Sequence, residues 1–159
     1  MSPTTAFAFL CTCSLGFSLL ASEQKLARKD VPKAVLDAAA ARAPKAKVEG
    51  FTLEKNGDKT IYEVKLREGK QVSELMIAAD GKVVSEERVL AAKDLPDAVK
   101  KALAGGAHAK AKVIAAEELT DHEKGGAKSF EVTVAQAGKK RELVFSAEGA
   151  LLKDEPAGD

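Results

Sequence analysis

The sequence predicts an α+β fold built from two tandem repeats, each with one helix packed on one face of an antiparallel sheet of about four strands. The main observation is a segment that recurs: residues 29–35 read KDVPKAV and residues 93–99 read KDLPDAV. Further matches follow in the same order, with AKV at 46–48 and 111–113 and an aromatic-Glu-Val triplet at 62–64 and 130–132. A repeat of this length indicates two similar supersecondary units packed side by side.

Each repeat begins with a helix that has one apolar stripe. Small and aliphatic residues recur at positions i, i+3, i+4, i+7 and i+8, which places them on one helical face. They are Val31, Ala34, Val35, Ala38 and Ala39 in the first helix and Leu95, Ala98, Val99, Ala102 and Leu103 in the second. Pro32 and Pro96 lie in the first turn, where a missing N–H costs little. Because alanine dominates the stripe, we expect each helix to approach its sheet closely.

After each helix the pattern changes to a period of two, which is typical of half-buried strands. The inward positions are Tyr62, Val64, Leu66, Leu75 and Ile77 in the first repeat and Phe130, Val132, Val134, Leu143 and Phe145 in the second. We expect Tyr62 and Phe130 to be equivalent core anchors. Asp80-Gly81 and Glu148-Gly149 predict tight turns into a last strand. Residues 48–54 and 113–119 predict an earlier strand in each repeat, and their blurred alternation indicates either a bulge or a looser edge.

The first residues of the chain differ in kind from the rest. Residues 6–20 carry no charge, and Ala21-Ser22 precede the charged residues that follow. This pattern predicts a secretory signal cleaved after Ala21, in a run shorter than the roughly 20 apolar residues of a membrane-spanning helix. We therefore expect a periplasmic or secreted protein with no membrane insertion after cleavage. Cys11 and Cys13 would leave with the signal, so the mature chain would contain no disulfide.

The expected organisation is a signal over residues 1–21, a short linker over 22–27, one repeat over 28–90, a second over 91–156 and a tail over 157–159. The chain has 25 basic and 24 acidic residues, and the two signs are interspersed. No basic patch stands out, so we expect no nucleic-acid partner.

The order of a Pro-started helix, an aromatic-Glu-Val strand and an Asp-Gly turn resembles the PepSY-like repeat. Two such units behind a signal resemble the tandem PepSY-like family of exported proteins grouped with β-lactamase-inhibitor-like proteins. The resemblance covers roughly residues 28–156. It implies a non-enzymatic binding module that restrains or regulates an envelope or extracellular hydrolase. The aromatic-rich face and the disulfides of the β-lactamase inhibitor itself have no counterpart here.

The sheet face away from the helices is the candidate binding surface for an exported protein or peptide, because the helices would cover the other face. Its outward residues are Ile61, Glu63, Lys65, Glu74 and Met76 in the first repeat and Glu131, Thr133, Glu142 and Val144 in the second. The loops near Gly57 and His122 are the next candidates.

No catalytic motif, phosphate-binding loop or metal-binding helix pattern occurs in the sequence. We therefore expect no enzyme, no metal site and no cofactor. The alternative is a small-ligand or metal-sensing periplasmic protein, based on the acidic pair Glu117-Glu118 and the Asp121-His122-Glu123 loop.

Overall fold

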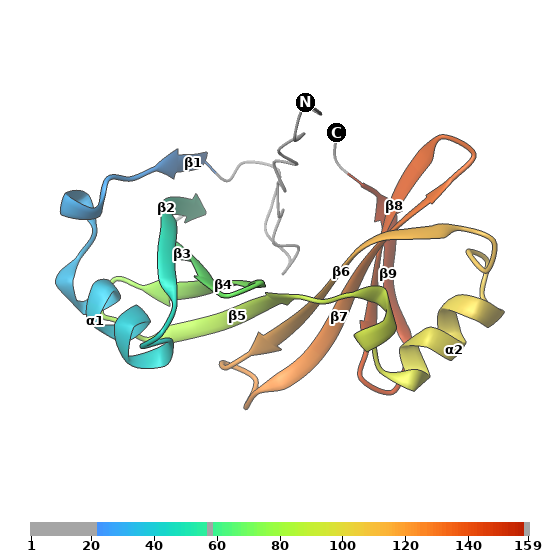
Figure 1. The fold of residues 1–159 in the computed structure, drawn as a ribbon. Helices are drawn as coiled ribbons and strands as arrows, with labels where there is room; N and C mark the ends of the chain where they lie inside the picture. The colour runs from blue at the N-terminus through green and yellow to red at the C-terminus, as the bar shows by residue number, and fades with distance from the viewer. Residues whose placement is uncertain (1–21, 57–58, 158–159) are drawn as a thin grey trace, which may run out of the picture.

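The computed structural model describes residues 22–56 and 59–157 and contains one antiparallel sheet whose nine strands lie in chain order (Figure 1). The strands are β1 (Ser22–Lys25), β2 (Lys47–Asn56), β3 (Lys59–Glu68), β4 (Gln71–Ala78), β5 (Val83–Val89), β6 (Lys112–Asp121), β7 (Ala127–Gln136), β8 (Lys139–Ser146) and β9 (Leu151–Pro156). The helices are α1 (Lys33–Arg42) and α2 (Asp97–Gly105), each preceded by a short 3₁₀ turn, η1 (Arg28–Asp30) or η2 (Ala92–Asp94).

The prediction of an α+β fold with two tandem helix-on-sheet repeats is wrong. The last strand before α2 and the first strand after it pair with each other, with Ser85 opposite Asp121 and Val89 opposite Glu117. Within residues 22–56 and 59–157, this pairing joins the nine strands into a single sheet that carries two short α-helices. The tandem PepSY-like architecture is therefore not supported. Local sequence similarity could not reveal the pairing, because it depends on two strand edges that are far apart in the chain.

The N-terminal residues also differ from expectation. Ser22–Lys25, expected as part of a linker, form the edge strand β1 and pair with Thr52–Lys55 of β2. The predicted signal over 1–21, with Cys11 and Cys13, lies outside the described residues, as do the hairpin residues 57–58 and the last two residues of the tail. Among the residues described, no helix is long and apolar enough to cross a membrane.

Both helices cover the same face of the sheet, where they bury two hydrophobic clusters (Figure 1). The first cluster consists of Val31, Val35, Ala39, Phe51, Val64, Leu66, Leu75 and Ile77. The second consists of Leu95, Val99, Ala116, Phe130, Val132, Val134, Leu143 and Phe145. Phe130 is fully inside its cluster, whereas Tyr62 is only partly buried at the margin of the other. The two aromatic residues are therefore not equivalent anchors.

The predicted turns and bulges are confirmed. The register shifts between Val48 and Gly50 and between Val113 and Ala115, where the alternation of the sequence is blurred. Gly81 and Gly149 have φ values of 90° and 85°, and each turn lies against a helix backbone. A Cβ on Gly149 would stand 2.6 Å from the carbonyl oxygen of Ala98. The alanine-rich helices thus approach the sheet as closely as the sequence predicts.

Candidate functional site: a glutamate band on the open sheet face

The sheet face opposite the helices carries one glutamate from every strand. The alternation of side chains and the strand registers place these residues on the same face. They are Glu23, Glu54, Glu63, Glu74, Glu87, Glu117, Glu131, Glu142 and Glu155. We call this row the glutamate band and the surface that contains it the open face. Within the described residues, no helix packs on the open face.

The band is continuous from one edge of the sheet to the other. Four pairs are directly opposite across neighbouring strands: Glu23/Glu54, Glu74/Glu87, Glu117/Glu131 and Glu142/Glu155. The other neighbours along the band are offset by two residues, so they are diagonal partners on the same face. Like charges directly opposite each other destabilise an antiparallel pair. The sheet therefore carries on one face four pairs of carboxyl groups that repel each other when both members are ionised.

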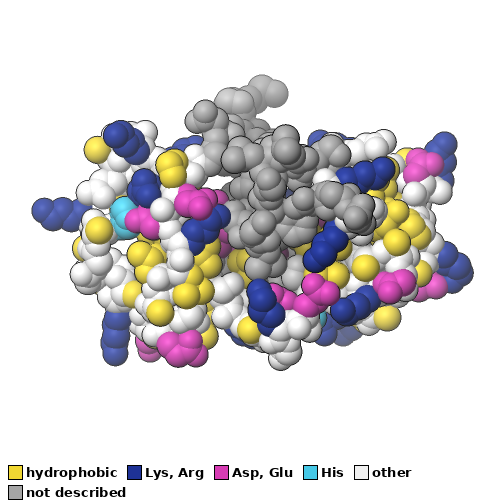
Figure 2. Space-filling model, turned by 180° about the vertical axis from the view of Figure 1, so that it is seen from behind, with side chains coloured by type: hydrophobic (Ala, Val, Ile, Leu, Met, Phe, Trp, Pro, Cys, Tyr) yellow, Lys and Arg dark blue, Asp and Glu magenta, His cyan; other side chains and the backbone are white. Residues whose placement is uncertain are grey.

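Within the described residues, two lysines form ion pairs with members of the band. Lys65 binds Glu74 with an Nζ–Oε1 distance of 2.7 Å. Lys153 lies 3.6 Å from Glu142 and 2.9 Å from Glu155. The whole chain has a net charge of only +1, so the negative surplus is local to this face. Seen from behind (Figure 2), acidic, basic and hydrophobic side chains all occur on the visible surface.

Burial and mutual repulsion perturb two carboxyl groups near the centre of each half of the band. Desolvation, and then the charge of Glu74, raise the pKa of Glu63 to about 8. Desolvation, and then the charge of Glu142, raise the pKa of Glu131 to about 8. Glu87 also raises the pKa of both groups, although it lies on β5 between them. The band therefore behaves as one electrostatic unit across the middle of the sheet.

All nine residues predicted as a binding surface lie on the open face. Glu63, Glu74, Glu131 and Glu142 belong to the band, with Lys65 beside Glu74. Met76 faces Glu63 across the strands, Val144 faces Glu131, and Thr133 faces Glu142, while Ile61 faces Ala78. Met76 is only 4% exposed, so it is not the prominent contact point that the sequence suggested.

Sequence reasoning missed the remaining members of the band. Glu54, Glu87 and Glu117 are buried polar residues on this face, and Glu23 and Glu155 are exposed on the two edge strands. Glu117 had been considered only as part of an acidic loop. The available signal was one outward glutamate in every predicted strand, but the row becomes visible only when the strands are placed in register.

The acidic residues considered for a metal site are engaged elsewhere, whereas His122 Nε2 is buried and has no hydrogen-bond partner among the described residues. Asp121 Oδ1 accepts hydrogen bonds from the backbone N–H groups of Glu123 and Lys124, and Glu123 pairs with Lys82 at 3.1 Å. His108 lies in the loop after α2, and its Nε2 is 2.9 Å from Asp154 Oδ2. In residues 22–56 and 59–157, no group of three or more His, Cys, Asp or Glu residues is placed to hold a metal ion.

The fold resembles several solved structures, although no family model and no curated protein matches the chain. A BLIP-like protein from Bacteroides fragilis is 28% identical, with a TM-score of 0.65 over 81% of this chain and 89% of that one. A DUF2874 family protein from Bacteroides uniformis is 16% identical, with a TM-score of 0.68 over 79% and 89% of the two chains. A protein from Bacteroides eggerthii, provisionally described as periplasmic, is also 16% identical, with a TM-score of 0.68 over 79% and 88%.

These neighbours share the architecture of the chain, and the periplasmic description agrees with the localisation expected from its sequence. The chain is thus similar in fold to BLIP-like and DUF2874 family proteins of Bacteroides.

Proposed function

We propose that the chain is a non-enzymatic exported module that binds a protein or peptide with basic side chains through its open face. The observation that carries this proposal is the glutamate band, with one carboxylate on each of the nine strands. A partner that brings lysine or arginine side chains to this face would relieve the repulsion within the four directly opposed pairs. Such complementarity favours rapid association and selects against acidic partners.

The rest of the open face suits a protein or peptide better than a small ion. Ile61 and Val144 are partly exposed and lie beside the band, so they can supply apolar contacts next to the charged ones. Interfaces commonly combine an apolar centre with charged surroundings. Neighbouring strands are about 4.7–4.9 Å apart, so the carboxylates form a row along which successive basic side chains can align.

The similarity to a BLIP-like protein supports a protein partner. We extend the proposal to the regulation or inhibition of an exported hydrolase, as the sequence resemblance implies. The metal-sensing alternative gains no support, because the charged side chains of the Asp121–Glu123 loop pair with neighbouring lysines or bond to the backbone of their own turn.

The direct test uses a fluorescent peptide of alternating lysine and alanine and the exported chain. Fluorescence anisotropy should show saturable binding that weakens as salt is added, since salt screens charge–charge attraction. Replacing two band residues together, Glu74→Gln with Glu142→Gln, should weaken binding by about tenfold or more. A peptide of alternating glutamate and alanine should not bind.

The matched control removes the same charge elsewhere. Glu123 and Glu148 are exposed and lie outside the band, so Glu123→Gln with Glu148→Gln should leave the affinity unchanged. Circular dichroism verifies that both double variants are folded. Equal losses in the two variants would show that net charge, not the open face, governs binding, and the proposal would then be wrong.

A further inference from the structure

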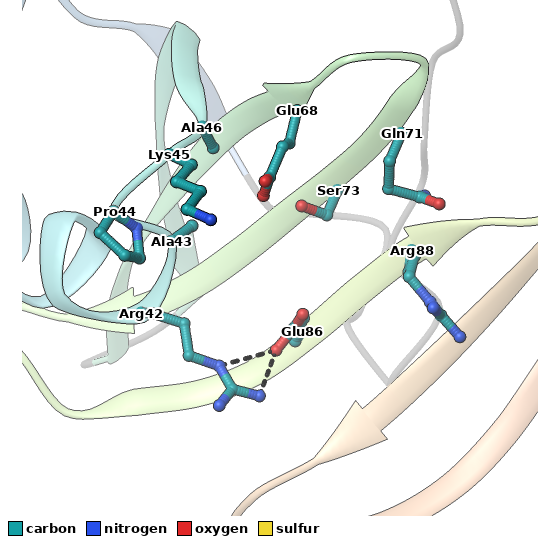
Figure 3. A pocket seen from close by; sticks show the side chains of 10 residues that line it. All are labelled: Arg42, Ala43, Pro44, Lys45, Ala46, Glu68, Gln71, Ser73, Glu86 and Arg88. Atoms are coloured by element: carbon teal, nitrogen blue, oxygen red, sulfur yellow. Dashed lines mark hydrogen bonds and ion pairs between the residues drawn. The ribbon is translucent and has the colours of Figure 1, made fainter.

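A second surface feature lies on the helix side of the sheet, away from the glutamate band. It is a hollow of about 240 Å³ between the C-terminal end of α1, the β3–β4 hairpin and β5 (Figure 3). The hollow therefore has room for a compound the size of an amino acid or a dipeptide.

Three of the charged groups that line the hollow, Arg42, Glu86 and Arg88, are already in ion pairs. The Nε and Nη2 atoms of Arg42 donate to the same Glu86 oxygen at 3.0 and 2.7 Å (Figure 3). Arg88 Nη2 lies 3.3 Å from Glu118 Oε1, so the guanidinium group of Arg88 pairs with a residue of β6. These contacts fix α1 and β5 on opposite sides of the hollow.

Two further charged groups point toward the middle of the hollow. Figure 3 shows the ammonium group of Lys45 and the carboxylate of Glu68 directed inward, with the Ser73 hydroxyl between the β3 and β5 walls. In the described part of the chain, neither Lys45 nor Glu68 forms an ion pair within 4.0 Å. The hollow is thus lined by one ammonium group, of Lys45, and one carboxylate, of Glu68, that form no ion pair within the described residues.

In the other half of the sheet, side chains of the chain itself occupy the position that matches the hollow. Counting from the matched residues Glu74 and Glu142, the position of Ser73 corresponds to Arg141, and Glu86 corresponds to Asp154. Arg141 binds Asp154 with an Nε–Oδ1 distance of 2.5 Å, and His108 binds the same carboxylate at 2.9 Å. A short serine in place of the arginine leaves the hollow open.

We propose that this hollow binds a small zwitterion, an amino acid or a dipeptide, with its carboxylate on Lys45 and its ammonium group on Glu68. A zwitterion satisfies both unpaired groups at once, whereas a simple anion or cation leaves one of them unmatched. The site is separate from the open face, so it does not depend on the function proposed above.

Nuclear magnetic resonance of the exported chain provides the test, with alanine and alanylalanine as separate probes. We expect saturable shifts of the backbone amide resonances of Lys45, Glu68 and Ser73, and the tighter of the two probes identifies the ligand size. N-acetylalanine and alaninamide each lack one charge, so each should bind about tenfold more weakly or not at all.

Three variants locate the site. Lys45→Gln and Glu68→Gln replace exposed residues and should each reduce the affinity about tenfold, whereas Lys110→Gln, an exposed lysine after α2, should not change it. Ser73→Arg should abolish binding by reproducing the filled arrangement of Arg141. If Ser73→Arg does not fold, the two glutamine variants decide the question. Absence of saturable shifts at Lys45, Glu68 and Ser73, or unchanged affinity in both glutamine variants, would overturn the proposal.

Discussion

The substitution Gly149→Ala tests the close docking of the β8–β9 turn on helix α2. Gly149 has φ of +85°, a backbone conformation that residues with a Cβ rarely adopt. An added Cβ would also stand 2.6 Å from the carbonyl oxygen and 2.8 Å from the carbonyl carbon of Ala98. Both atoms belong to the helix backbone, so relief requires α2 or the turn to move.

The two effects have separate magnitudes. The positive φ alone costs about 1–2 kcal/mol for an alanine. Overpacking against a fixed neighbour adds about 1–3 kcal/mol, so the free energy of unfolding should fall by about 2–5 kcal/mol in total. Gly138 separates the two contributions, because its φ is +76° but nothing lies within 4 Å of its Cβ position. Gly138→Ala should therefore lose only the first contribution.

Urea unfolding of the wild type and both variants measures the difference, with unchanged slopes indicating that the denatured state is the same. The reasoning predicts that Gly149→Ala unfolds at a clearly lower urea concentration than Gly138→Ala. If the two variants lose equal stability, the turn does not press on α2 and the packing described here is incorrect.

Two further predictions concern the band and the core. The native pKa of Glu63 and Glu131 is about 8, well above the ordinary value of 4.5. The folded state therefore holds more protons than the unfolded state between these values, and wild-type stability should fall as the pH rises through this window. Glu63→Gln with Glu131→Gln should remove much of that fall and melt higher than the wild type above pH 8; a lower melting temperature there would contradict the pKa shifts. In the core, Phe130→Ala should cost about 3–5 kcal/mol in urea unfolding, because Phe130 is only 3% exposed. Tyr62→Ala should cost less, since Tyr62 is partly buried, and equal losses would show that its burial is greater than described.

Local elements of the fold were predictable because they depend on neighbouring residues. The apolar spacing from Val31 to Ala39 gives α1, the alternation around Val64 and Val132 gives central strands, and Gly81 and Gly149 give the turns. The single sheet was not predictable from these signals. It depends on pairing between β5 and β6, whose polar residues give no periodic sign of which edge they meet.

The candidate site was predictable in part for the same reason. Alternation identifies which side of a strand Glu63 and Glu131 occupy, so the face was correctly assigned. It does not reveal the neighbours across the strands. The burial of Glu131 and its direct opposition to Glu117 depend on the register of β6 and β7. The sequence alone does not give this register, so the outward glutamates looked like an ordinary solvated surface.

The pairing of β5 with β6 has a consequence for how the molecule deforms. The ladder spans five residue pairs, and its helix-side neighbours are polar, with Glu86 opposite Thr120 and Arg88 opposite Glu118. The two hydrophobic clusters have no member in common among the described residues, and the β5–β6 ladder joins the two halves of the sheet that carry them. A small change of twist at the ladder would swing one half of the sheet relative to the other while both cores stay packed. Because the glutamate row crosses this ladder between Glu87 and Glu117, the same change of twist would also change the curvature of the row.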